Sequence, residues 1–247
     1  MTNRDLLRPI LQSRMPDDLR AAAAARLPAM RPVVLADWLR VDDAYAAQLA
    51  LKADLIAARR ADVIVVREGA GAALDELLGY VLAHLPDGFA VSGDAVTRPD
   101  GVTVALDRDD PLLTLSQIVQ EDLCILEKRG DEHVLTAALL CFPSSWTLAQ
   151  KIGKPLGEIH VPVQEYDDNI ARRVQRLFDG VQVGRPLWRA NFLRYDEAAL
   201  FQPRREDDPR LVGGPDARFE RSERQTVLRL PDTGAVVFSI HVSVVAL

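Results

Sequence analysis

The stretch DLCILEKRGDEHVLTAALLCF, residues 122–142, decides the fold of this chain. Two apolar runs flank the polar tripeptide Gly130-Asp131-Glu132, and a short polar turn in that position predicts an antiparallel hairpin of two long strands. The second run, HVLTAALLCF, is apolar at successive positions instead of alternate ones. Because that pattern is typical of strands covered on both faces, we expect the second strand in the interior of a sheet.

Three more strands are predicted further along the chain, over LWRANFLRY (187–195), RFERSERQTVLRL (218–230) and AVVFSIHVSVV (235–245). Between the hairpin and these strands lies a segment with two helical stretches, residues 143–184. The element order is two strands, a helical insert and three strands, which is the order of a PAS-like domain. We therefore predict an α+β fold, a PAS-like five-stranded antiparallel sheet with one face covered by the insert.

The first part of the chain has the composition of a helical region. Helices are expected over residues 16–27, 43–60 and 70–84, with a short strand at 61–66 and a small hairpin around the turn signal Pro99-Asp100-Gly101. We assign residues 1–110 to an N-terminal helical extension with a small hairpin, and residues 111–247 to the PAS-like domain. The length also allows both parts to form one compact unit.

Composition excludes several classes of function. A net charge of −6 argues against nucleic acid as the main partner, because phosphate binding requires a basic face. The two cysteines, Cys124 and Cys141, lie in apolar runs and are expected as buried thiols in a reducing compartment. No apolar run reaches the ~20 residues of a membrane span, and MTNRDLLRPIL has no signal-peptide core, so we expect a cytoplasmic protein.

Histidine is scarce, and one of the four histidines stands out. His160 lies in KPLGEIHVPV, between apolar neighbours and close to two prolines, so it is either a core histidine or a metal ligand. His241 follows as the second choice, because it lies on a strand face with Ser239 and Ser243. His133, just after the hairpin turn, is expected to be exposed to water. Motifs for a dedicated zinc site, a serine nucleophile or a dinucleotide-binding loop are not present.

Polar residues in the late strands form a second group of candidates. Arg189 and Asn191 project to one face of their strand, and Arg224 and Thr226 to one face of the next. Guanidinium groups suit carboxylates, including those of a tetrapyrrole. The alternative is that these arginines lie on a solvated outer face of the sheet.

Three segments resemble the haem-dependent oxidative N-demethylase family: FPSSWTLAQKIGKPLGEIHVPV, RVQRLFDGVQVGRPLWRANF and ERQTVLRLPDTGAVVFSI. They occur in the family's order, and the resemblance extends over residues 37–240. It implies a PAS-like fold with N-terminal helices and haem b in the PAS cavity. The implied activity is that of a dimethylamine monooxygenase, which uses dioxygen to remove a methyl group from a small secondary amine and releases formaldehyde. Electrons would come from NADPH through flavin and iron–sulfur partner proteins, that is, a separate reductase.

Carried onto this chain, the resemblance implies His160 as the axial ligand of the haem iron. It makes Arg224, Arg189 and Asn191 candidates for contacts to the haem propionates or in the distal pocket. A catalytic residue is not identified. Two rival hypotheses use the same fold: a non-catalytic sensor that binds haem or another small ligand, and an interaction domain with a filled cavity.

Overall fold

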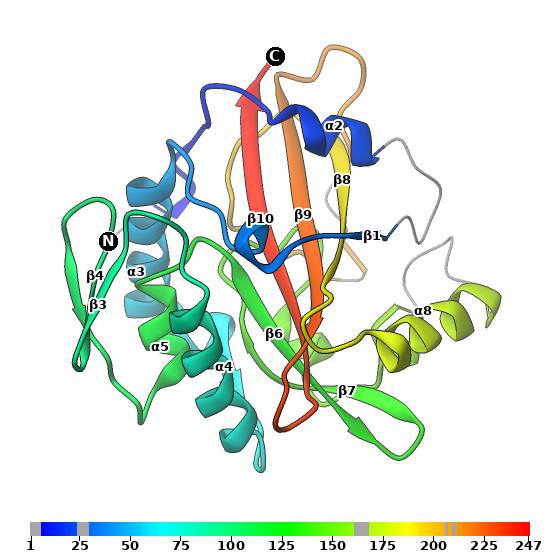
Figure 1. Cartoon of the computed structure of the whole chain (residues 1–247). Coiled ribbons are helices and arrows are strands. Elements are labelled where there is room, and N and C mark those ends of the chain that lie inside the picture. Colours follow the sequence, from blue (N-terminus) through cyan, green and yellow to red (C-terminus); the bar gives the residue numbers. More distant parts are fainter. Residues whose placement is uncertain (1–5, 24–29, 161–167, 206, 209–210) are drawn as a thin grey trace.

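The computed structural model describes residues 6–23, 30–160, 168–205, 207–208 and 211–247. Its centre is a seven-stranded antiparallel sheet in the order β1-β8-β9-β10-β6-β7-β2 (Figure 1). Helices from the N-terminal half lie on one side of this sheet, and the helical insert lies on the other.

The five long strands that the sequence predicts are all present. They are β6 (Asp122–Arg129), β7 (Glu132–Leu139), β8 (Leu187–Tyr195), β9 (Phe219–Arg229) and β10 (Val236–Ala246). The hairpin turns are made by glycines at positive φ, Gly130 between β6 and β7 and Gly234 between β9 and β10. Glycine suits both positions because it has no Cβ to clash in the left-handed region.

The predicted number of strands in the sheet, five, is too low. Two short strands from the N-terminal half complete it. β1 (Arg31–Pro32), which was not predicted, pairs with β8, and β2 (Ile64–Val66), the short strand expected within residues 61–66, pairs with β7. Strands of two or three residues carry no periodic pattern, but they satisfy backbone groups that the outer long strands would otherwise expose. β7 consequently has a neighbour on each side, and most of its residues are buried, as its apolar sequence predicts.

The N-terminal half contains the three expected helices together with shorter elements. The expected helices are α2 (Asp17–Ala23), α3 (Tyr45–Val63) and α4 (Gly71–Ala83), and the shorter elements are the 3-10 helix η1 (Leu35–Asp37), β3 (Ala90–Ser92), β4 (Ala95–Thr97), β5 (Thr103–Ala105) and α5 (Pro111–Ser116). The expected small hairpin is a three-stranded sheet, because Gly93 at positive φ adds a second turn. Asp110 caps α5 by accepting a hydrogen bond from the Leu113 backbone N–H.

The described residues of the insert form three helices where two were predicted. They are α6 (Leu148–Lys151), α7 (Leu156–His160) and α8 (Asp168–Gly180). The helix missed by the prediction, α7, starts directly after Pro155, a residue favoured at helix starts. The C-terminal end of α8 is tied to the sheet by Arg229, which donates to the carbonyls of Phe178 and Val181.

Both halves of the chain contribute to one apolar core. The largest buried cluster contains Leu51 and Leu77 from the N-terminal helices together with Leu123 and Val236 from the sheet. Cys124 and Cys141 are buried in the same cluster, as predicted. In the described part of the chain, no helix combines the length and apolar character that crossing a bilayer requires.

Candidate functional site

The strand register assigns the polar side chains of β8, β9 and β10 to two opposite faces of the sheet. Ala190 pairs with Arg224, which pairs with His241, so these three share one face. Arg189 and Asn191 alternate with Ala190 and therefore project from the other face. The first face is covered by the N-terminal elements and the second by the insert.

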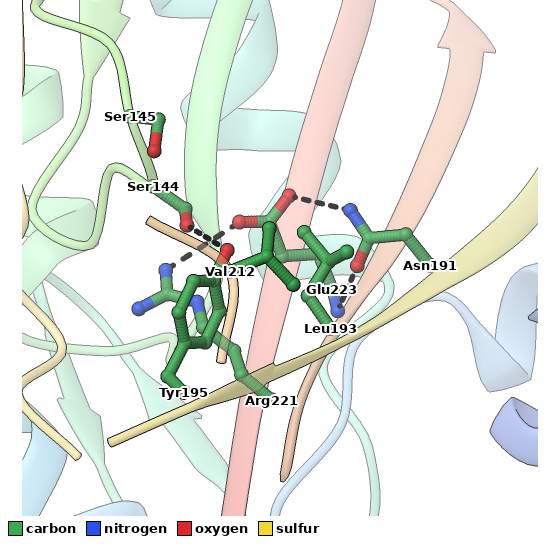
Figure 2. Close-up of a pocket in the computed structure, with 8 residues that line it drawn as sticks. All are labelled: Ser144, Ser145, Asn191, Leu193, Tyr195, Val212, Arg221 and Glu223. Atoms are coloured by element: carbon green, nitrogen blue, oxygen red, sulfur yellow. Dashed lines mark hydrogen bonds and ion pairs between the residues drawn. The ribbon is translucent and has the colours of Figure 1, made fainter. Parts of the chain in front are cut away.

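The insert-facing side carries a small cavity, shown in Figure 2. Its volume is about 230 Å³, and it is lined by Ser144, Ser145, Asn191, Leu193, Tyr195, Val212, Arg221 and Glu223. Hydroxyl, amide, guanidinium and carboxylate groups meet here beside two aliphatic side chains. This combination of a few convergent polar groups with an apolar wall is typical of small-molecule sites.

A buried ion pair forms one wall of the cavity. Arg221 donates to the carbonyls of Phe142 and Leu200 at 2.7 and 3.1 Å, and its Nη2 lies 3.4 Å from a Glu223 carboxylate oxygen. The other Glu223 oxygen accepts from Asn191 at 3.2 Å. Arg221 therefore holds two loops against the sheet. In the described structure, Glu223 Oε1 accepts only the long 3.4 Å hydrogen bond from Arg221.

The opposite wall comes from two loops. Ser144 Oγ lies 3.3 Å from the Tyr195 hydroxyl, and the next residue, Ser145, adopts a φ of 65°, which is uncommon for a residue with a side chain. Val212 is held in place by its neighbour Gly213, whose N–H donates to the Arg194 carbonyl at 2.7 Å. A Cβ on Gly213 would lie 2.7 Å from the Cβ of Ala217, so only glycine allows this close approach.

Arg189 lies on the same face in a different environment. It is half-buried, and its Nε is buried without a hydrogen-bond partner in the described structure. Burial lowers the pKa of Arg189, although the nearby Glu223 carboxylate opposes the shift. A desolvated guanidinium with an unused N–H is suited to bind an anionic oxygen.

The first-choice ligand, His160, is the last residue of α7. Its side chain and the segment 161–167 lie outside the described residues. The carbonyl of the preceding residue, Ile159, accepts a hydrogen bond from Lys151, which ties α7 to α6. The backbone of α7 also packs against α8 and β7, on the insert-facing side of the sheet.

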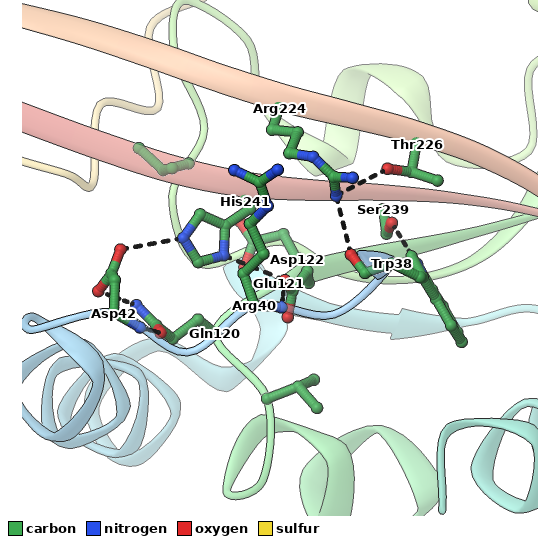
Figure 3. Close-up of polar contacts among 12 residues, drawn as sticks. Trp38, Arg40, Asp42, Gln120, Glu121, Asp122, Arg224, Thr226, Ser239 and His241 are labelled. Atoms are coloured by element: carbon green, nitrogen blue, oxygen red, sulfur yellow. Dashed lines mark hydrogen bonds and ion pairs between the residues drawn. The ribbon is translucent and has the colours of Figure 1, made fainter. Parts of the chain in front are cut away.

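Arg224 is separated from Arg189 and Asn191 by the thickness of the sheet, contrary to the expectation of a shared pocket. It donates to the Trp38 carbonyl at 2.9 Å (Figure 3) and to the Asp37 carbonyl at 2.8 Å. Its guanidinium carbon lies 4.9 Å from the centre of the Trp188 ring. Burial is the main cause that lowers the pKa of Arg224 to about 10. In this structure Arg224 joins the N-terminal segment to the sheet.

His241, the second-choice ligand, is also on the N-terminal side and is bound at both ring nitrogens. Nδ1 lies 3.0 Å from Glu121 Oε1, and Nε2 lies 3.1 Å from Asp42 Oδ2 (Figure 3). Burial alone would lower the pKa of His241, but the hydrogen bonds and charges of the two carboxylates outweigh it and raise the pKa to about 9. A protonated imidazole between two acids has no lone pair to offer a metal.

His133 differs from the sequence-based expectation of exposure to water. Its side chain is 1% exposed, because α8 covers it: the His133 ring lies 5.6 Å from that of Phe178, and Nδ1 is 3.0 Å from the Gln175 amide. Burial lowers the pKa of His133. The expectation was wrong because the covering helix is about forty residues away in sequence.

The donor chemistry of the insert-facing side fits a haem in part. Arg189 offers an unused N–H to a propionate, whereas the 230 Å³ cavity is below the roughly 300–1,000 Å³ of pockets for drug-sized ligands. The cavity therefore suits a molecule of a few heavy atoms and not a porphyrin. Of the residues that the structure describes, Arg189 is the one that would contact a haem propionate. Among the described residues, no group of three or more His, Cys, Asp or Glu is arranged to hold a metal ion.

Among the residues that line the cavity, only Asn191 was predicted as a site residue. The polar side chains that the prediction missed include Ser144, Tyr195, Arg221 and Glu223. Tyr195 is in phase with Arg189 and Asn191 along β8, so the alternation contained a signal for it. Arg221 and Glu223 are in phase with each other on β9, but only the pairing of β8 with β9 places them beside Asn191.

A family model described as haem-dependent oxidative N-demethylase, alpha subunit-like, matches residues 29–247. The matched region contains the seven-stranded sheet, the insert and every residue of the cavity.

Proposed function

Because the chain belongs to the haem-dependent oxidative N-demethylase alpha subunit-like family, we propose that it is a haem-dependent monooxygenase that demethylates a small secondary amine and releases formaldehyde. The family match over residues 29–247 is the observation that carries the proposal. The alternative is a non-catalytic sensor that binds haem or a small ligand with the same fold.

The PAS-like character of the domain is part of the proposal. Its support is the order of the five long strands, two before the insert and three after it, together with the insert on one face of the sheet. In this arrangement the cofactor lies between insert and sheet. Because fold alone does not decide function, the proposal depends on the residues that lie between the insert and the sheet.

Within that layer we assign His160 as the axial ligand and Arg189 as the propionate contact, with Asn191 at the border of the cavity. His160 remains the first choice because both nitrogens of His241 bind carboxylates on the other face. When bound, the haem iron would supply the activation of dioxygen. NADPH as the electron source, with flavin and iron–sulfur proteins as carriers, stays part of the proposal, as does a cytoplasmic location.

The cavity of Figure 2 is the proposed place for the amine. Glu223 supplies a carboxylate that attracts an ammonium group, and Leu193 and Val212 supply contacts for methyl groups. Asn191 and Arg221 hold the Glu223 carboxylate in place, so the counter-charge does not have to reorganise when the amine binds. The volume of about 230 Å³ limits the substrate to a small amine.

A visible spectrum after haem addition tests the cofactor. The wild-type protein and a His84→Ala control should show the same Soret band, whereas His160→Ala should shift or abolish it. His84 is a suitable control because it ends α4 and its Nδ1 is bound to the Tyr80 carbonyl. An unchanged band in His160→Ala would refute the ligand assignment, and no band in the wild type would refute haem binding.

Formaldehyde release from dimethylamine, with dioxygen and a chemical reductant, then divides enzyme from sensor. The enzyme hypothesis requires formaldehyde that depends on both haem and dioxygen. A haem-loaded protein that releases none would favour the sensor.

A further inference from the structure

Helix α8 has one covered side and one strongly basic side. Phe178 is buried, and Val174 and Leu177 are partly covered. The opposite side carries three exposed arginines, Arg172, Arg173 and Arg176, which we call the arginine face. Spacings of three and four residues place these side chains next to one another on a helix.

The arginine face has no carboxylate partner among the described residues. Most other exposed arginines among the described residues do have one, for example in the pairs Arg20–Glu220, Arg60–Asp110, Arg108–Asp94 and Arg204–Asp208. Like charges at these spacings destabilise a helix by about 0.2–0.5 kcal/mol per pair. A basic cluster without a carboxylate partner in the described part of an acidic chain is therefore suited to a partner outside the chain.

The position of α8 indicates which partner that is. α8 packs against α7, the helix that ends at His160, and Arg229 anchors its C-terminal end to β9. The arginine face thus lies on the outside of the layer to which the haem is assigned.

We propose that the arginine face docks an acidic one-electron donor protein of the ferredoxin type, an inference that rests on the proposed function. Complexes of this class are transient and have small interfaces, often below about 1,200 Å², so a few charges influence them strongly. Attraction between a basic patch and an acidic partner raises the association rate by about 10- to 1,000-fold and weakens as salt is added. The arginine face meets this requirement although the whole chain is acidic.

The test is the affinity for a plant-type [2Fe–2S] ferredoxin, measured by calorimetry at low ionic strength and at 0.5 M salt, with the protein both as purified and after haem addition. One variant carries Arg172→Glu, Arg173→Glu and Arg176→Glu. The control carries Arg14→Glu, Arg108→Glu and Arg204→Glu, which reverses three exposed arginines elsewhere and changes the net charge equally.

The arginine-face variant should bind at least about tenfold more weakly than wild type at low salt, the control variant within about threefold, and 0.5 M salt should remove most of the difference. Equal weakening in both variants would overturn the proposal, since net charge alone would then explain it. Failure of the wild type to bind at low salt would also overturn it. Binding with this pattern but no Soret band would refute the proposed function and leave the docking surface standing.

Discussion

Replacing His241 by glutamine should remove a pH-dependent part of the protein's stability. In the structure, His241 is 3% exposed and lies between Glu121 and Asp42, and Gln120 also donates to Asp42. Arg40 donates its backbone N–H to Glu121. Glutamine has nearly the length of histidine and can still donate hydrogen bonds, but it carries no charge at any pH.

The magnitude follows from the pKa of His241, about 9 in the folded chain against an ordinary value of 6.5. Because the folded pKa is raised, the stabilisation is fully present below about pH 6.5 and is lost as the pH rises through 9. At 1.36 kcal/mol per pKa unit, the free energy of unfolding should fall by about 3 kcal/mol between pH 6 and pH 9.5. On the acid side, hydrogen bonds from His241 and its charge hold the pKa of Asp42 at about 2 against the opposing effect of burial. The stabilisation from Asp42 is therefore lost only as the pH falls below about 3.8 and through 2.

Urea unfolding at pH 6, 7.5 and 9.5, with linear extrapolation to water, measures the effect. The quantity to compare is the difference in unfolding free energy between the wild type and His241→Gln. Burial also raises the pKa of Cys124 and Cys141, and their thiols lower stability at alkaline pH. This contribution is present in both proteins and cancels in the difference.

The difference should shrink by about 3 kcal/mol from pH 6 to pH 9.5. A difference that stays constant within about 1 kcal/mol over this range would refute the reasoning, because His241 would then not be charged in the folded chain. Loss of stability in the variant that is equal at all pH values would indicate a packing defect instead.

Three further variants probe the buried charges, each by urea unfolding at pH 7. Lys52→Met should destabilise the protein by about 3–5 kcal/mol, because Asp122, 3.2 Å away and fully buried, is left without its cation. The double variant Lys52→Met with Asp122→Asn should recover part of this loss. Additive effects of the two substitutions would contradict a direct interaction. Arg221→Met should cost a similar amount of about 3–5 kcal/mol, since Glu223 loses its cation, whereas a loss below about 1 kcal/mol would show that the pair is solvated. Arg189→Met should change the stability of the haem-free protein by less than about 1 kcal/mol, because the guanidinium lacks a partner at Nε. The same variant should retain haem about tenfold more weakly, with Arg189→Lys intermediate. Unchanged haem retention would show that Arg189 does not contact the haem.

Much of the fold was predictable because its signals are local. The alternation in LWRANFLRY predicts the bounds of β8, and the apolar run HVLTAALLCF predicts β7, which ends a few residues earlier than the run. Glycines at the turns mark the ends of the hairpins. The apolar run at residues 61–66 predicts β2, although not which strand it pairs with. β1 was not predictable in the same way, since a two-residue strand is defined only by the strand it pairs with. Helix α7 was not predicted, because a helix of five residues is too short to carry a periodic pattern.

The candidate site, like the fold, has a part that local sequence patterns predict and a part that depends on contacts between distant residues. Counting along one strand places Arg189 and Asn191 together, and it also suggests Tyr195, because successive side chains of a strand point to opposite faces. The sequence by itself thus determined the long strands, the insert between them, the buried cysteines and the relative facing of residues within each strand. Only the tertiary structure decided that Arg224 and His241 lie on the opposite side of the sheet from Arg189, that α8 buries His133, and that Glu223 meets Asn191. The physical reason is that faces are shared between strands through hydrogen-bond register, and register depends on residues far apart in the chain.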